Sequence, residues 1–323
     1  MDFTEIDYSG RMDQIMIKTL DEIMNLAKTF GKSRVVVPAA EDKHVIEAVT
    51  EAQKIGLIDA CLIGNKKKIL SIADELQIDA TGYEILDELN IDKAIRLSIE
   101  MVNNGKADII MKGMLQTADL LKAVLDKDAS LRQKNRILSH VVILESKNYP
   151  KLLYITDVGL NVAPDLKQKM SIIQNTVDVA LRLGNDKPKV AVLSAVEIVN
   201  PDMQCTMDAA VLSKMAERGQ IKNCMIDGPL ALDNAINKEA AAQKNLKGLV
   251  AGDADILLVP DIEAGNILYK GLSFLGGFRS IGGVIVGAKI PLVVVSRAES
   301  TESKLYSIAL AIILSGENRG RMN

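Results

Sequence analysis

Four short polar segments contain residue types that could bind an anion or stabilise a developing negative charge. Each follows an apolar run typical of a buried strand: 112–119 (KGMLQTAD), 227–234 (DGPLALDN), 261–266 (DIEAGN) and 296–302 (SRAESTE). Ligands of open α/β sheets collect at the carboxyl ends of strands, so these segments are candidates for a functional site. None of the four is specific by itself.

The segment at 296–302 contains three side chains with possible roles in catalysis or anion binding. The Ser296 hydroxyl could donate a hydrogen bond to a developing oxyanion. The guanidinium of Arg297 offers a fixed fork of donors that matches phosphate. Glu302 lies in the next helical turn and could accept a proton. The alternative is a capping segment whose arginine pairs with a surface acid.

The segment at 112–119 could hold an anion at a helix start. A strand ends at Lys112, Gly113 turns the chain, and the Thr117 hydroxyl follows where free N–H groups and the helix dipole favour negative charge. Thr117 could equally be only the N-cap of that helix.

The segments at 261–266 and 227–234 are open to two interpretations. Gly265 leaves room for a ligand near the backbone, Asn266 can donate or accept, and Lys270 follows in the same helix. The alternative is that Asp261 only caps the helix and Lys270 is solvated. In 227–234 a tight turn explains the Gly-Pro pair without any function.

Composition excludes several functions. Lys plus Arg is 39 and Asp plus Glu is 42 among 323 residues, giving a net charge of −3, and the chain has no Trp. A concentrated basic face and stacking aromatics are therefore missing, and we expect no nucleic-acid partner. No apolar run is long enough for a membrane helix and the start does not resemble a signal peptide, so we expect a cytoplasmic protein. Two His and three widely spaced Cys predict no metal site.

Strand-like apolar runs alternate with helical periods, which predicts an α/β fold with largely parallel sheets. The predicted strands are Arg34–Ala40, Ala60–Gly64, Ala107–Lys112, Val141–Leu144, Leu152–Thr156, Lys189–Ala195, Cys224–Asp227, Asp255–Val259, Val284–Gly287 and Leu292–Ser296. The clearest helix is Asp165–Leu183, with an Asp cap and apolar residues at helical spacing. The glycines in 275–287 are interpreted as a flexible loop before a strand. P-loop and GxGxxG patterns are missing from their expected places.

Together the segments resemble the phosphate acetyltransferase and phosphate butyryltransferase family. KGMLQTADLLKAVL, ITDVGLNVAPDLKQK, GDADILLVPDIEAGNILYK and VVVSRAESTESKLYSIALA occur in the family's order, and the resemblance spans about residues 15–316. It implies transfer of an acyl group between coenzyme A and inorganic phosphate, with coenzyme A as a substrate and no permanently bound cofactor or metal. It also implies two three-layer α/β/α domains with a cleft between them, as in the isocitrate and isopropylmalate dehydrogenases. We expect 1–134 with 288–323 as the first domain and 135–287 as the second.

The resemblance also implies roles for particular residues. Ser296 would stabilise the oxyanion and Arg297 would hold phosphate. Thr117 and Asn266 would line the same pocket, so Ser296 should face Asn266 across the cleft, and Lys112, Gly265 and Lys270 complete the expected phosphate and coenzyme A site. Two departures favour the butyryl-type branch: Ser303 stands where acetyl-type relatives have an aspartate, and Lys122 stands where they have an arginine.

Three other functions compete with a butyryl-type enzyme. One is a phosphate acetyltransferase. Another is a metal-dependent decarboxylating dehydrogenase on the same architecture, with Asp227, Asp253 and Asp255 as candidate ligands. The third is a two-lobed ligand-binding module; a catalytically dead homologue is disfavoured because Ser296 and Arg297 are intact.

We also expect a homodimer or higher homo-oligomer, because 261–275 and 306–314 are unusually apolar for a monomer surface.

Overall fold

The computed structural model describes residues 16–296 and 299–321, with side chains to residue 316. Contacts between residues divide the chain into two compact units. The terminal unit comprises Leu20–Gln133, His140–Ile143 and the described part of Arg279–Asn323. The central unit comprises Lys134–Ser139, Leu144–Phe278 and the described part of Met1–Thr19.

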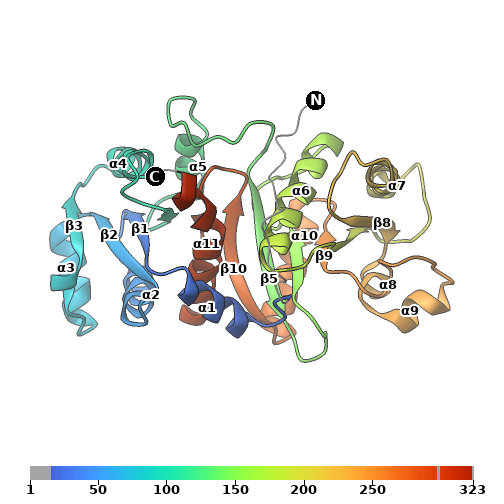
Figure 1. The fold of residues 1–323 in the computed structure, drawn as a ribbon, viewed down its shortest axis with the longest axis horizontal. Helices are drawn as coiled ribbons and strands as arrows, with labels where there is room; N and C mark the ends of the chain where they lie inside the picture. Colours follow the sequence, from blue (N-terminus) through green and yellow to red (C-terminus); the bar gives the residue numbers. More distant parts are fainter. Residues whose placement is uncertain (1–15, 297–298, 322–323) are drawn as a thin grey trace. The chain divides into compact units, whose positions relative to one another are not determined.

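The terminal unit is built on a mainly parallel sheet (Figure 1). Its strands run in the order β3-β2-β1-β4-β11-β10, and β10 alone among these pairs antiparallel with its neighbour. The strands are β1 (Ser33–Pro38), β2 (Ile58–Gly64), β3 (Glu84–Asp87), β4 (Ile109–Met111), β10 (Arg279–Val286) and β11 (Leu292–Val293). The helices are α1 (Leu20–Thr29), α2 (Lys43–Lys54), α3 (Lys66–Glu75), η1 (Ala80–Gly82), α4 (Ile91–Asn103), α5 (Thr117–Val124) and α11 (Thr301–Arg321).

The central unit repeats this plan with a parallel sheet in the order β6-β9-β7-β8. Its strands are β6 (Leu153–Thr156), β7 (Lys189–Leu193), β8 (Met225–Leu230) and β9 (Ile256–Leu258). Its helices are α6 (Leu166–Arg182), α7 (Gln204–Glu217), α8 (Leu232–Ile236), α9 (Lys238–Gln243), α10 (Ile262–Lys270) and the π turn η2 (Gly271–Leu275). Strand β5 (Ser139–Glu145) has residues in both units.

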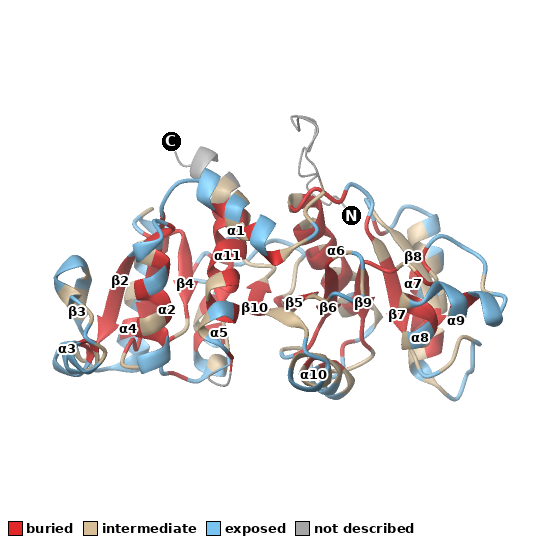
Figure 2. Cartoon of the chain, turned by 90° about the horizontal axis from the view of Figure 1, so that it is seen from below, coloured by how far each residue is buried: buried red, intermediate tan, exposed pale blue. Residues whose placement is uncertain are grey.

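Burial explains why several strands in both units are continuous apolar runs in the sequence. All residues of β4, β6 and β9 are buried, and Figure 2 shows these three strands in red. A parallel strand covered by helices on both faces has no solvent side, so the alternation of a half-exposed strand disappears.

Short polar side chains start several of the helices. Asp165 accepts a hydrogen bond from the backbone N–H of Gln168 at 2.7 Å, and the Gln168 side chain accepts in return from the Asp165 backbone. This capping box satisfies two donors that a helix start leaves without partners. The predicted helix over 165–183 is confirmed, with Asp165 as its N-cap.

The interpretation of the glycines in 275–287 as a loop before a strand is wrong for Gly282 and Gly283, whereas Gly276 and Gly277 do precede β10. Gly282 and Gly283 lie inside β10, which begins at Arg279. A Cβ on Gly283 would lie 2.2 Å from the Val294 carbonyl oxygen, and one on Gly282 would lie 2.8 Å from the Ser303 Oγ. These glycines therefore allow close packing of β10 against the chain around it.

The expected domain boundaries lie at 134/135 and 287/288. The contact units change close to the first of these and one strand before the second. The contact units change at Gln133/Lys134 and at Phe278/Arg279. Strand β10 belongs to the terminal unit because it pairs with β11. The division into independent domains stays a prediction.

The apolar segment Tyr306–Leu314 lies in α11, beside α1 and β10 (Figure 1). Tyr306 and Ile308–Ile313 are at most 5% exposed, so these side chains belong to the core of the terminal unit. No helix in the described part of the chain has the length and apolar character needed to cross a membrane.

Candidate functional site

The terminal unit gathers several of the predicted residues at one edge of its sheet. Chain connections diverge between β1 and β4, and this switch point is where open α/β sheets bind ligands. Lys112 follows β4, and Ser296 follows β11, the neighbour of β4. The Lys112 backbone N–H donates to the Val293 carbonyl at 2.9 Å, which joins the two strand ends. The Ser296 side chain is exposed there.

Lys112 secures the turn that follows β4. Its ammonium donates to the carbonyls of Gly113 at 3.2 Å and Leu115 at 3.0 Å. A Cβ on Gly113 would lie 2.1 Å from the Ala39 carbonyl oxygen, so only glycine fits where this turn crosses the end of β1. Lys112 therefore places a positive charge at the edge while holding the turn that leads into α5.

Thr117 is the first residue of α5, and the N-cap position belongs to Gln116, whose side chain makes no capping hydrogen bond. The capping alternative for Thr117 is therefore not what the structure shows. Its half-buried hydroxyl lies at the helix start, where backbone N–H groups favour an anion. Lys122 is exposed in the last turn of α5, more than one turn from Thr117.

Two side chains of the segment after Ser296 pack against β10. The Glu299 backbone N–H donates to the Ser296 carbonyl at 3.1 Å, and its carboxylate accepts from the Ser303 hydroxyl at 3.4 Å. Glu299 is 8% and Ser303 is 4% exposed, and both lie over Gly282. The Ser303 hydroxyl thus has a carboxylate beside it. Arg297 lies outside the described residues.

Glu302, the predicted proton acceptor, is engaged elsewhere. Its carboxylate accepts from the Arg279 guanidinium at 2.9 Å, and that guanidinium also bonds Asp21 at 3.1 Å and the Tyr306 hydroxyl. The Tyr306 hydroxyl in turn donates to Asp21. Glu302 therefore belongs to an ion-pair network that links α1, β10 and α11.

His140 in β5 lies over β10 in the terminal unit. A Cβ on Gly283 would lie 2.7 Å from the His140 Nε2, so the imidazole occupies the space beside this glycine. The Val294 backbone N–H donates to the Gly283 carbonyl at 3.2 Å, two residues before Ser296. The ring is thus packed near the strand end that carries Ser296.

The central unit places Gly265 and Asn266 in the first turns of α10, which follows β9. The Asp261 carboxylate accepts from the Ala264 N–H at 2.8 Å, so Asp261 is the N-cap of α10. This agrees with the alternative interpretation of the segment, in which Asp261 caps the helix. A Cβ on Gly265 would lie 2.8 Å from the Asp157 carbonyl oxygen. The close approach at Gly265 is thus to the chain's own backbone. Asn266 is exposed, and its amide donates to the Val158 carbonyl at 3.3 Å.

Lys270 ends α10 beside two aromatic rings. Its Nζ lies 4.7 Å from the centroid of the Tyr269 ring and 5.4 Å from that of Phe274. Such cation–π contacts restrict the ammonium to one side of the helix. Lys270 is half-buried rather than freely solvated.

The aspartates proposed as metal ligands serve other purposes. Asp255 bonds the Lys151 ammonium at 2.6 Å and the Lys189 backbone N–H at 2.7 Å. Asp253 also pairs with Lys151, at 3.2 Å. Asp227 accepts from the Gly228 N–H at 2.8 Å, and both residues lie inside β8, so the tight turn expected at this Gly-Pro pair is wrong. Among the residues described, no group of three or more His, Cys, Asp or Glu could hold a metal ion.

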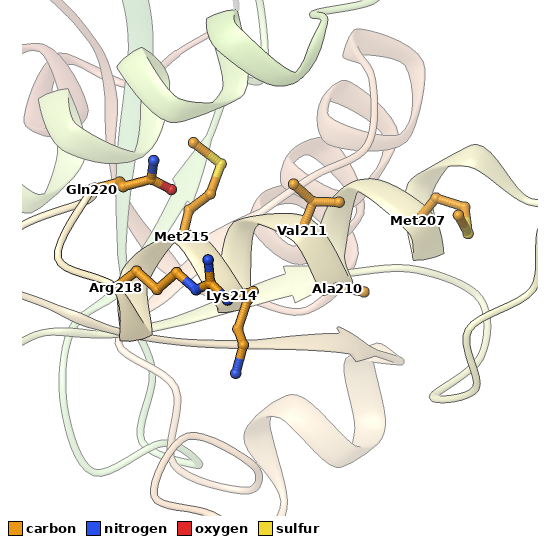
Figure 3. Close-up of a pocket in the computed structure, with 7 residues that line it drawn as sticks. All are labelled: Met207, Ala210, Val211, Lys214, Met215, Arg218 and Gln220. Carbon is orange, nitrogen blue, oxygen red and sulfur yellow. The ribbon is translucent and has the colours of Figure 1, made fainter. Parts of the chain in front are cut away.

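A shallow pocket of about 400 Å³ lies on α7 in the central unit (Figure 3). It is lined by Met207, Ala210, Val211, Lys214, Met215, Arg218 and Gln220. None of the predicted site residues lines it, and the Lys214 ammonium pairs with Glu217. This pocket has no part in the predicted site.

Solved phosphotransacylase structures share this arrangement of two units of largely parallel sheet. A branched-chain phosphotransacylase from Enterococcus faecalis matches with a TM-score of 0.77 and 33% identity, over 88% of this chain and 99% of that one. A phosphotransacetylase from Streptococcus pyogenes matches with a TM-score of 0.76 over 94% of this chain and 99% of that one; at 22% identity it shows the fold alone.

Sequence similarity assigns the family. The family model described as "Phosphate acetyl/butaryl transferase" matches residues 18–96 and 86–312, and the chain belongs to this family. A phosphate butyryltransferase from Clostridium acetobutylicum is 46% identical over 93% of this chain and 99% of its own length. A phosphate acetyltransferase from Thermotoga maritima is 44% identical over 91% of this chain and 99% of its own length. The expected fold class and phosphate acyltransferase activity are confirmed.

Sequence reasoning missed two buried carboxylates beside predicted site residues, Glu299 and Asp157. Glu299 lies only three residues after Ser296, and its helical spacing to Ser303 could have suggested the contact. Asp157 directly follows a predicted strand, which is the criterion that selected the other segments.

Proposed function

We propose that this phosphate acyltransferase moves a butyryl-type acyl group between coenzyme A and inorganic phosphate. Both substrates would bind together, so no covalent acyl-enzyme forms. The central support is the position of Ser296. It is exposed three residues after the end of β11, and the Val293 carbonyl at that strand end accepts from the Lys112 N–H at the switch point of the sheet.

The reaction needs stabilisation of charge more than a strong base. A phosphate oxygen attacks the thioester carbonyl carbon, and the carbonyl oxygen becomes an oxyanion. The carbon–sulfur bond then breaks, the thiolate leaves, and the proton lost by phosphate passes to sulfur. In the reverse direction the thiol loses that proton and attacks the acyl phosphate. Holding both substrates in line lowers the barrier by itself.

The predicted residues other than Glu302 have roles in this scheme. The Ser296 hydroxyl donates to the oxyanion, and Arg297 holds phosphate. Thr117, Lys112 and Lys122 supply donors and positive charge at the start and along α5. On the central unit Asn266 contacts a substrate, Gly265 brings α10 close to the neighbouring turn, and Lys270 supplies a second cation.

The cysteines support direct transfer. Burial raises the pKa of the Cys61 thiol to about 12 and that of the Cys224 thiol to about 12. A thiolate, not a thiol, attacks a carbonyl, so neither side chain is suited to carry the acyl group.

Acyl preference rests on exposed aliphatic side chains beside the predicted residues. Met114 follows Gly113 and is 41% exposed, and Val162 in the central unit is 63% exposed. Leu115 and Leu230 are at most 6% exposed and belong to the core. Each buried methylene contributes about 0.8 kcal/mol, so two methylenes give roughly 10- to 20-fold preference for butyryl over acetyl.

The decisive measurement is kcat/KM for acetyl-, propionyl-, butyryl- and isobutyryl-CoA at saturating phosphate. We expect a maximum at butyryl with tolerance of isobutyryl. Identities of 46% and 44% to a butyryl and an acetyl enzyme do not separate the two. A maximum at acetyl would assign the chain to the phosphate acetyltransferases.

We also propose a homodimer, with α10 and η2 as the candidate contact. Ile267, Phe274 and Leu275 there are 73%, 58% and 91% exposed, and Figure 2 shows α10 as largely uncovered. Light scattering across micromolar concentrations tests this proposal, and a monomer throughout would reject it.

A further inference from the structure

Asp157 is a buried carboxylate at the carboxyl end of β6. It is 2% exposed. Its oxygens accept from the backbone N–H groups of Gly159 at 2.9 Å, Leu160 at 3.0 Å and Asn161 at 3.3 Å, and from the Asn161 amide at 2.6 Å. A carboxylate offers about four acceptor positions, so these four donors fill them. Asp157 organises the turn that follows β6 and is not available to a substrate.

The turn is anchored at a second point. The Asn161 amide nitrogen also donates to the Leu138 carbonyl at 2.9 Å. Both hydrogens of that amide are therefore used, one on Asp157 and one on the chain before β5. The segment 158–161 is held between two fixed partners.

The same turn supports the start of α10. Strands β6 and β9 are parallel neighbours, so the segments after them lie side by side. A Cβ on Gly265 would lie 3.2 Å from the Val158 Cα, and the Asn266 amide donates to the Val158 carbonyl at 3.3 Å. An amide held by one N–H keeps its carbonyl oxygen and its second N–H for a ligand.

We infer that Asp157 is the positioning residue for Asn266. The carboxylate fixes the turn, the turn fixes the Val158 carbonyl, and that carbonyl orients the Asn266 amide toward substrate. The inference rests on the proposed function, in which Asn266 contacts a substrate of acyl transfer.

The test compares Asp157→Asn, Asn266→Ala and the double variant by kcat and KM for butyryl-CoA and phosphate. An amide at 157 presents N–H groups where backbone N–H groups already converge, so the turn loosens. We expect each single variant to lower kcat/KM about 10-fold, with the double variant no worse than Asn266→Ala alone. Residues that act as a unit show such non-additive effects.

The control is Asp255→Asn. Asp255 is a carboxylate 3% exposed in the same unit that accepts a backbone N–H, but it bonds Lys151 and Lys189 rather than the start of α10. We expect it to lower the thermal midpoint and leave kcat/KM within about twofold. If Asp157→Asn does not fold, Asn161→Ala loosens the same turn and should show the same non-additivity with Asn266→Ala.

An Asp157→Asn enzyme with wild-type kcat/KM would overturn the inference, and so would effects that multiply in the double variant. The inference is also overturned if Asn266→Ala keeps the wild-type kcat/KM while Ser296→Ala lowers it. In that case the proposed acyl transfer stands. Failure of the proposed function is separate, because the wild-type protein would then release no coenzyme A from butyryl-CoA and phosphate.

Discussion

The Arg279 guanidinium lies 2.9 Å from the Glu302 carboxylate, so the acid predicted to accept a proton is instead one arm of an ion-pair network. Arg279 starts β10, Glu302 lies in the first turn of α11, and Asp21 of α1 completes the network. The Glu302 carboxylate is therefore already engaged by a cation of the terminal unit.

Glu302→Gln should therefore leave turnover within about threefold of wild type. Loss of a general base would instead lower kcat by about 10²- to 10⁴-fold. The stability change should be below about 1 kcal/mol, because 59% of the Glu302 side chain is exposed. Glu217→Gln, which breaks the exposed pair with Lys214, is the matched control. A hundredfold fall in kcat for Glu302→Gln alone would restore it as the proton acceptor.

Ser296→Ala should lower kcat about 10²-fold and change KM little. Its hydroxyl is proposed to act on the oxyanion, which exists only in the transition state. Ser300→Ala is the control, because the Ser300 hydroxyl accepts from the Ser303 N–H at 3.1 Å at the start of α11. That variant should lose about 1 kcal/mol of stability and keep its turnover. Full turnover in Ser296→Ala would contradict the assigned mechanism.

Gly283→Ala should destabilise the protein by about 1–3 kcal/mol in urea unfolding. Its Cβ would lie 2.2 Å from the Val294 carbonyl oxygen and 2.7 Å from the His140 Nε2. Gly271→Ala is the control, because a Cβ there has no neighbour within 4 Å and its φ is −59°. If the two variants were equally stable, the packing described for β10 would be wrong.

Asp227→Asn should raise the free energy of unfolding at neutral pH. Burial raises the pKa of Asp227 above its ordinary value of 3.8, and Glu217 adds to this shift. The folded state thus disfavours the charged form, so the stability that this group contributes in acid is lost as pH rises above 3.8. Denaturation curves should show the gain near neutral pH and no gain well below pH 3.8.

Asp21→Asn is the control, because it should change the free energy of unfolding at neutral pH in the opposite direction. The hydrogen bond from Arg279 lowers the pKa of Asp21, so this carboxylate stabilises the fold above its ordinary pKa and loses that effect in acid. The variant should be less stable than wild type at neutral pH, by no more than about 1 kcal/mol because the side chain is 66% exposed. A pH-independent difference for either variant would contradict these assignments.

The strands that the sequence predicts well are those buried on both faces. β4 and β9 consist of Ile, Leu and Met, and β1 contains three consecutive buried Val residues; these side chains leave solvent in any packing of helices on a sheet. β3 was not predicted, because its residues Glu84–Asp87 alternate little and are exposed or half-buried at the sheet edge. An edge strand is defined by its partner β2 rather than by its own pattern.

The sequence alone was sufficient for the α/β class, for the cap of α6 at Asp165 and for the family, because each depends on local patterns or on motif order. Tertiary structure decided the partners of individual side chains. Arg279 meets Asp21 across 258 residues of sequence, and Asn266 meets the Val158 carbonyl across 108. Hydrophobic periodicity records which side of an element is buried but not what lies against it. Only the folded chain therefore shows that Glu302 is paired, that Gly283 is packed and that the Asn266 amide donates to the Val158 carbonyl.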